Sequence, residues 1–433
     1  MTINIRKLLF IDEFQLSLLA IKRETGRYLF LFFQLIIFAD VWKFCRADEL
    51  LFFNCIISGL LALRNKIEWQ KIVLVLLVYG LVILGPIINM GLNVLMLNQY
   101  IGYAIRILTA CFIASYFKYD FIVKFENLVY VLTYISIPLY FIQVIDPHIF
   151  DIFTPISKLI MAGRQNYMTP SGITMHQYIF LFLMNGWAQS RNSGFMWEPA
   201  AFGMMLTWSF LLCIYLKRFR WHPRMIIYAI AMLTTFSLGT YSYALFLLLI
   251  FIMQNADWRK IVYVIIGAIC VVLMLTQTNL LDENVEMMTN KVENYAENSE
   301  KRLERTSGMY IIQDTSPKRV DRMSQLFILR EILQEAPLGR GMAQWKYSSA
   351  NGLMTLVVMW GYSILLILII AYYFFFKQIS KIPRIHPHNY IIILSMLVMI
   401  MSLIGNPVYN QVFFFVLLIY SFFAKQYNRY ERS

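Results

Sequence analysis

The stretch from Arg191 to Gly203, Arg-Asn-Ser-Gly-Phe-Met-Trp-Glu-Pro-Ala-Ala-Phe-Gly, combines a cation, a tight turn and a helix start. A guanidinium group such as that of Arg191 forms charge-assisted, often bidentate hydrogen bonds to phosphate or carboxylate oxygens. Gly194 allows the backbone to approach a ligand closely because it has no Cβ. Glu198 followed by proline is typical of a helix start, where the helix dipole favours an acid. The stretch therefore predicts an anion-binding loop at the start of an apolar helix.

A second cationic motif runs from Arg330 to Gly341, Arg-Glu-Ile-Leu-Gln-Glu-Ala-Pro-Leu-Gly-Arg-Gly. The apolar spacing predicts a helix over 321–335 that ends before the proline and carries Arg330, with Arg322 as a companion. The glycines on both sides of Arg340 would let backbone N–H groups and a guanidinium surround phosphate oxygens. The alternative is a solvated charged helix followed by an ordinary loop.

A third cation, Arg106, lies inside the apolar run from Tyr100 to Phe117. At about 1.5 Å of rise per residue, it would lie roughly 10 Å below the outer end of a membrane helix. A charge at that depth is costly unless it faces protein, water or a counter-ion, so it indicates a functional position. The alternative is a structural ion pair with Asp40.

Two further residues are candidate substrate contacts. The segment 236–243, Phe-Ser-Leu-Gly-Thr-Tyr-Ser-Tyr, interrupts a long apolar run and predicts a tight turn between two helices. Tyr241 is the residue of this turn best suited to contact a phosphate, although packing would also explain it. His176 has the chemistry of a general base, and an ordinary polar contact is the alternative.

The composition is that of a polytopic membrane protein. Of the 433 residues, 59% are hydrophobic and 15% are charged, and apolar runs of helix-spanning length recur along the chain. The net charge of +13 therefore indicates membrane topology rather than a nucleic-acid partner. The five cysteines lack the spacing of a zinc site, and no P-loop or dinucleotide-binding turn occurs. We expect neither a metal nor another cofactor.

The apolar runs predict an all-α fold of about twelve transmembrane helices. The predicted spans are 28–45, 49–63, 71–88, 99–117, 126–145, 198–216, 225–238, 240–254, 260–277, 350–376, 389–404 and 408–424. Lysine and arginine are concentrated in the connections that lie inside if the chain starts inside, with 217–224 as the clearest cluster. This asymmetry predicts that both termini are cytoplasmic, and residues 1–27 would form an interfacial amphipathic helix.

These spans divide the chain into a membrane part, residues 28–277, a large outer loop, 278–349, and a second membrane part with the tail, 350–433. The first membrane part includes another long outer segment, 146–196. Its short apolar run, Tyr178 to Met184, predicts a helix that lies in the interface or re-enters the protein. The large loop predicts a helix over 282–305 in addition to the one that carries Arg330.

The layout and motifs together resemble the O-antigen polymerase (Wzy) family. The resemblance is carried by the number of spans, by Ser-Gly-x-x-x-Glu-Pro over 193–199, by Ser237 and Ser242 in the following hairpin, and by the late loop ending at Gly341. That family belongs with the O-antigen ligases to a superfamily of GT-C-like membrane glycosyltransferases. Members often show arginine, ten residues and glycine in both large outer loops. The late loop matches this pattern, whereas Arg191 is separated from Gly203 by eleven residues, which leaves Arg164 as an alternative.

The resemblance implies joining of undecaprenyl-pyrophosphate-linked oligosaccharide repeats on the periplasmic side of the bacterial inner membrane, with a chain-length regulator as a partner. Arg191 and Arg330, with help from Arg106 or Arg340, would stabilise the departing pyrophosphate, and Glu198 would orient or deprotonate the acceptor. Ligases carry a histidine after the late loop, where this chain has Asn351, so the resemblance favours a polymerase. The alternatives are an O-antigen ligase and a flippase for the same lipid-linked glycan.

Overall fold

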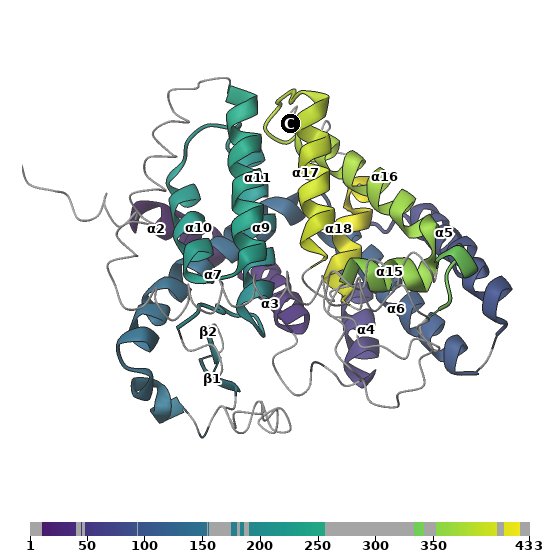
Figure 1. Ribbon diagram of the computed structural model, residues 1–433, viewed down its shortest axis with the longest axis horizontal. Helices are drawn as coiled ribbons and strands as arrows, with labels where there is room; N and C mark the ends of the chain where they lie inside the picture. Colours follow the sequence, from purple (N-terminus) through teal and green to yellow (C-terminus); the bar gives the residue numbers. More distant parts are fainter. Residues whose placement is uncertain are drawn as a thin grey trace, which may run out of the picture.

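The computed structural model describes residues 11–39, 45, 48–92, 94–153, 155, 175–179, 182–185, 190–255, 333–341, 352–404 and 411–424. These residues are mostly helical (Figure 1). The elements are α2 (Ile11–Arg23), α3 (Thr25–Ala39), α4 (Asp48–Leu63), α5 (Trp69–Met90), α6 (Val94–Phe117), α7 (Asp120–Ile145), a 3-10 helix η2 (Pro147–Phe153), β1 (Met175–Ile179), β2 (Phe182–Asn185), α9 (Pro199–Leu216), α10 (Pro223–Thr234), α11 (Leu238–Asn255), α15 (Gly352–Trp360), α16 (Tyr362–Ile379), α17 (Asn389–Ser402) and α18 (Val412–Phe423).

The helices have the length and composition of membrane segments. Five of those described, α5, α6, α7, α9 and α16, are long and apolar enough to cross a membrane, and six shorter helices are also apolar. The chain is therefore a largely helical membrane protein, as predicted. Helices occupy every predicted span within the described residues, and the span 260–277 lies outside them. The total of twelve spans stays a prediction.

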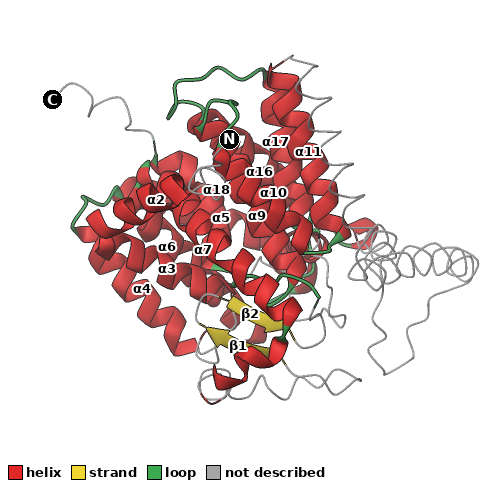
Figure 2. Ribbon diagram, turned by 90° about the vertical axis from the view of Figure 1, so that its left-hand side faces the viewer, coloured by secondary structure: helices red, strands yellow, loops and turns green. Residues whose placement is uncertain are grey.

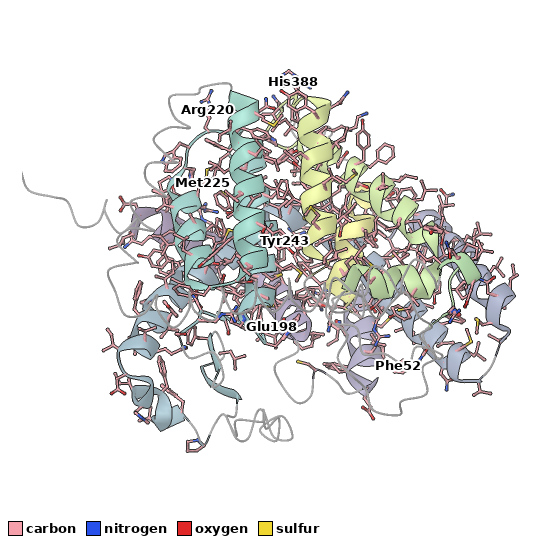
Figure 3. All side chains as sticks on the ribbon, in the orientation of Figure 1. Phe52, Glu198, Arg220, Met225, Tyr243 and His388 are labelled. Atoms are coloured by element: carbon pink, nitrogen blue, oxygen red, sulfur yellow. The ribbon has the colours of Figure 1, made fainter. Side chains whose placement is uncertain are left out.

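The bundle has two ends, which labelled residues near the helix termini identify (Figure 3). Figure 3 places Glu198 and Phe52 towards one end, which we call the site end, and Arg220 and His388 towards the opposite end. Glu198 precedes α9 and Arg220 follows it, so α9 runs from the site end to the opposite end. The predicted assignment of these two ends to the two sides of the membrane stays a prediction.

The core contains aliphatic and aromatic side chains, and aromatic contacts and buried hydroxyl groups join its helices. Phe125 packs on Phe413 of α18 with ring centroids 4.9 Å apart. The Trp208 indole N–H donates to Ser402 Oγ at 2.7 Å, which joins α9 to α17. Because lipid tails are as apolar as these side chains, such hydrogen bonds and close packing hold membrane helices together more than burial does.

The predicted span 350–376 is wrong as a single helix, because the chain breaks at Gly361. Its φ of 67° is in the left-handed region, and a Cβ there would lie 2.3 Å from the Pro337 carbonyl oxygen. The Tyr362 N–H donates to the same oxygen at 3.1 Å. The apolar run is continuous in the sequence, so the break depends on a contact with a distant loop. The result is a short α15 followed by a separate α16 (Figure 1).

The predicted helix over Tyr178 to Met184 is also wrong, because the chain forms an antiparallel β-hairpin. Strand β1 pairs with β2 in a register that places Met175 opposite Asn185. The hairpin lies at one end of the helices (Figure 2). The Leu183 N–H donates to the Gly194 carbonyl at 2.6 Å, so β2 also has a backbone partner outside the hairpin. Strand pairing provides hydrogen-bond partners for the backbone N–H and C=O groups of an apolar run that is too short to make a stable helix.

A buried ionic network joins α2, α7 and α10 at the opposite end. Arg224 Nη1 lies 2.6 Å from Glu126 Oε2, and its Nη2 donates to Ser17 Oγ at 2.9 Å and Asn127 Oδ1 at 3.1 Å. Its guanidinium also lies 4.6 Å from the Tyr130 ring centroid. The basic segment 217–224 is thus more than a topology signal, because its last residue is buried in a network that fixes α2 to the bundle.

Helices α9 and α11 approach each other closely at Gly203, which provides a stability test. A Cβ at this position would lie 1.8 Å from Thr240 Oγ1, so Gly203→Ala is expected to destabilise the protein by about 1–3 kcal/mol through overpacking. Gly80→Ala is the matched control, because nothing lies within 4 Å of a Cβ there and alanine is the better helix former. Thermal unfolding in detergent would compare the two, and equal melting temperatures would contradict the close packing of α9 on α11.

Candidate functional site

Residues 190–198, which we call the Arg191 loop, are held against the C-terminal end of α10. Asn192 donates twice to Thr234, from its backbone N–H to the carbonyl at 2.8 Å and from Nδ2 to Oγ1 at 3.0 Å. Arg191 Nε donates to the Thr235 carbonyl at 3.0 Å. The Tyr140 hydroxyl of α7 donates to the Ser190 carbonyl at 2.9 Å. The loop is therefore fixed mainly by main-chain groups of the α10–α11 turn.

Arg191 is a buried cation whose terminal amino groups are available as hydrogen-bond donors. Its residue is 9% exposed, and among the described residues only its Nε has a hydrogen-bond partner. The carbonyls at the end of α10 carry the negative end of the helix dipole, which stabilises a cation there. Burial lowers the pKa of the Arg191 guanidinium, and the charges of Glu198 and Tyr241 act in the opposite direction. Because arginine stays charged in proteins, both terminal amino groups can bind an anion.

Glu198 begins α9, as predicted. Its extended backbone, with φ of −155° and ψ of 159°, makes it the N-cap residue, and proline occupies the first helical position. The carboxylate is close enough to Arg191 to act electrostatically on its guanidinium. An acid and a cation thus flank the start of one helix at the site end.

The structure gives Gly194 a packing role, and its predicted contact with a ligand stays a prediction. Its φ of 52° does require glycine, but a Cβ would lie 2.4 Å from the ring of Phe202. The glycine therefore makes room for the first turn of α9. Its N–H is also occupied, since it donates to Asn192 Oδ1 at 2.8 Å.

Tyr241 lies near Arg191, and its charge acts on that guanidinium. Helix α10 ends at Thr234 and α11 begins at Leu238, so a turn separates the two helices, but it is shorter than the predicted 236–243 and Tyr241 lies in the first turn of α11. The Tyr241 hydroxyl donates to the Leu233 carbonyl at 2.7 Å, so its proton is already engaged. Its oxygen can still accept a hydrogen bond.

Residues 336–341, which we call the Arg340 turn, lie against the α15–α16 break. The Arg340 N–H donates to the Val358 carbonyl at 2.8 Å, and the Gly341 N–H donates to the Met359 carbonyl at 3.1 Å. The predicted cradle of backbone N–H groups around a phosphate is therefore wrong, because these donors are used by α15. The Arg340 guanidinium instead forms an ion pair with Glu335, which is largely exposed.

Close packing explains the glycines of the Arg340 turn. A Cβ on Gly339 would lie 2.6 Å from the Gly361 nitrogen, and one on Gly341 would lie 2.6 Å from the terminal methyl of Met96. Asn89 of α5 donates to the Gly339 carbonyl at 2.9 Å. The turn thus packs against the C-terminal ends of α5 and α15 and the first turns of α6.

Arg106 lies deeper in α6 than predicted. The helix begins at Val94, so Arg106 is roughly 18 Å from its first residue at about 1.5 Å per residue. The side chain is half-buried, its guanidinium lies 5.5 Å from the Tyr103 ring centroid, and it forms no ion pair with a described residue. The predicted alternative partner, Asp40, lies outside the described residues.

The structure brings only part of the predicted site together. Arg191, Glu198 and Tyr241 lie in one place, whereas Arg340 and Arg106 are held by a different set of helices. Predicted site residues outside the described part of the chain are Arg164, Arg322, Arg330 and Asn351. His176 is described only through its backbone, which pairs with Met184 in the hairpin.

Sequence reasoning missed the residues that hold the Arg191 loop. Asn192 is fully buried and adjoins the arginine, and asparagine in a tight turn is a detectable signal for a side chain that bonds the backbone. Tyr140 carries no such signal, because tyrosine is frequent throughout this chain. The described residues contain no group of three or more histidines, cysteines or acids placed to hold a metal.

The Arg191 loop can bind an anion next to a carboxylate. The cation is fixed by the α10–α11 turn and the acid by the start of α9, so neither depends on a flexible side-chain pairing with the other. Comparison of the chain with protein-family models, curated proteins and solved structures finds no match.

Proposed function

We propose that the chain is an O-antigen polymerase, which joins oligosaccharide repeats carried on undecaprenyl pyrophosphate. The protein would lie in the bacterial inner membrane with twelve spans and both termini in the cytoplasm, so that the site end faces the periplasm. The observation that carries the proposal is the buried guanidinium of Arg191, whose terminal amino groups have no partner among the described residues. A pyrophosphate leaving group requires such a donor.

The proposed reaction transfers the growing glycan to an incoming repeat. An acceptor hydroxyl oxygen bonds to the anomeric carbon of the donor sugar, and the bond from that carbon to the pyrophosphate oxygen breaks. The pyrophosphate leaves with the electron pair and gains negative charge, which Arg191 and, from the late loop, Arg330 stabilise. Glu198 is the candidate for accepting the hydroxyl proton, because it adjoins Arg191 at the start of α9.

Glycan length in a deletion strain tests this proposal. Loss of a polymerase leaves single repeats attached to the lipid core, and re-expression of this protein restores long glycans. Loss of a ligase leaves no attached glycan, and loss of a flippase traps repeats on the cytoplasmic leaflet. Either of the last two outcomes would replace the proposed activity with the corresponding one.

A further inference from the structure

An apolar cavity of about 250 Å³ lies between α5, α6, α16 and α18, with α15 along one side. Its lining is aliphatic and aromatic and includes Tyr79, Tyr103 and Trp360. The Tyr79 hydroxyl donates to the Tyr100 carbonyl at 2.7 Å. Its polar group is therefore occupied, and its ring lines the cavity. On α5 the lining extends from Leu74 to Val82, which is roughly 12 Å of helix. The cavity is therefore long enough for part of a hydrocarbon chain and offers water little to bind.

Helix α5, which forms one wall, packs weakly against the rest of the bundle. Only Ile72 and Pro86 are buried along its 22 residues. Leu77 and Leu81, which do not line the cavity, are 60% and 68% exposed. A hydrocarbon chain in the cavity would contact the inner face of α5, where the neighbouring helices do not.

A cation lies at the rim of this cavity. The Arg106 guanidinium is 5.5 Å from the ring centroid of Tyr103, which lines the cavity, and its charge also acts on Tyr79. One of its terminal nitrogens would lie 3.1 Å from a Cβ on Gly102, so the side chain points one helical turn towards the site end. Arg106 has no ion-pair partner among the described residues, and a half-buried charge of this kind needs an anion, water or another partner.

The polar backbone of the Arg340 turn lies near α6 at about the height of Gly102. A Cβ on Gly341 would lie 2.9 Å from the Tyr100 hydroxyl, and Tyr100 precedes Gly102 by only two residues, roughly 3 Å along α6. The Arg340 turn therefore packs on α6 at about the height along the helix that the Arg106 guanidinium reaches.

We propose that the cavity holds the isoprenoid chain of a second polyprenyl-linked substrate, with Arg106 binding its phosphate. This inference rests on the proposed polymerase, because joining two lipid-linked glycans requires two lipids to be bound together. Arg191 is held by α7, α10 and the Arg191 loop, whereas Arg106 and the cavity belong to α5, α6, α16 and α18. Two separate cations then serve two separate lipid phosphates.

The phosphate contact must provide much of the preference for such a lipid. Bilayer lipid chains are as apolar as the cavity, so moving a chain from one to the other releases little free energy. A charge-assisted hydrogen bond at low dielectric is much stronger than one in water. Loss of Arg106 should therefore weaken binding of the phosphorylated lipid more than a comparable change elsewhere on the lipid-facing surface.

Binding of undecaprenyl phosphate to the purified full-length protein in phosphatidylcholine nanodiscs tests the inference. Ala371 lines the cavity from α16, and Ala371→Phe should lower the affinity at least about tenfold by filling it. Ile370 is 47% exposed and does not line the cavity, so Ile370→Phe is the matched control and should bind as the wild type does. Arg106→Gln should also lower the affinity about tenfold, the loss expected with a charge-assisted contact.

Unchanged binding by Ala371→Phe would overturn the inference. If that variant does not fold, Val78→Phe takes its place, because Val78 also lines the cavity, from α5, and is only partly buried. Equal competition by dioleoylphosphatidylglycerol would also overturn it, because the cavity would then hold an ordinary phospholipid.

The second substrate site and the polymerase can fail separately. Arg191→Ala should retain binding of undecaprenyl phosphate at the cavity while losing polymer. If the cavity variants bind normally but polymer formation still requires Arg191, the cavity assignment is wrong and the polymerase stands. If a strain that lacks this protein still makes normal polymer, the proposed polymerase function is wrong, and the second substrate site loses its basis.

Discussion

Arg191→Ala is expected to abolish long glycan chains, with single repeats left on the lipid core. The side chain supplies terminal guanidinium donors at the proposed pyrophosphate, and loss of one such donor typically lowers turnover by about 10²- to 10³-fold. Arg191→Lys should fail as well, because lysine keeps the charge beside the end of α10 but loses the Nε bond to Thr235 and the bidentate geometry. Chain length on gels, normalised to protein in the membrane fraction, measures both variants.

Arg220→Ala is the control for this experiment. Arg220 is exposed and lies at the opposite end of the bundle (Figure 3), so its loss should leave chain length unchanged. Normal chains from Arg191→Ala would remove the Arg191 loop from the site. Normal chains from Arg191→Lys alone would mean that charge, rather than paired hydrogen bonds, is what the loop supplies.

Glu126→Ala is expected to cause the largest loss of stability, about 3–5 kcal/mol. It removes the carboxylate 2.6 Å from Arg224 and leaves the buried guanidinium with Glu13, 3.5 Å from its Nε, as its remaining carboxylate among the described residues. The Tyr228 hydroxyl, which donates to the Glu126 side chain, loses that acceptor as well. Unfolding of the purified protein in detergent, followed by circular dichroism, measures the change.

The matched control is Glu68→Ala, at the start of α5. Glu68 pairs with Lys71 across one helical turn and is partly exposed, so its loss should cost about 0–1 kcal/mol. Glu126→Leu combined with Arg224→Met should recover much of the stability, because an apolar pair of similar volume needs no counter-charge. A double variant no more stable than Glu126→Ala would show that packing, rather than the stranded charge, causes the loss.

The positions of the helices followed from the sequence because membrane helices are marked by the length of their apolar runs. The break at Gly361 and the β-hairpin did not, since each depends on a backbone group elsewhere in the chain. Gly361 is fixed by the Pro337 carbonyl, and β2 by the Gly194 carbonyl. The hydrophobicity of one segment does not indicate which distant backbone groups it contacts.

The candidate site was predictable to a similar extent. The residue types of Arg191 and Glu198 indicated a cation and an acid at a helix start, and the structure places both there. The backbone donors around Arg340 were misjudged because glycine spacing shows that a turn is tight and leaves open what its N–H groups bond. Here they bond α15, and the glycines accommodate neighbouring backbone and side chains.

The contact between Arg191 and the Thr235 carbonyl has an evolutionary consequence. Because the acceptor is a main-chain oxygen, any residue at position 235 that keeps the turn also keeps the contact. Relatives could therefore vary freely at position 235 while the arginine stays fixed, and correlated changes between the two positions would not report their proximity. The positions that should change together are those that shape the turn, such as Asn192 and Thr234, whose side chains do meet.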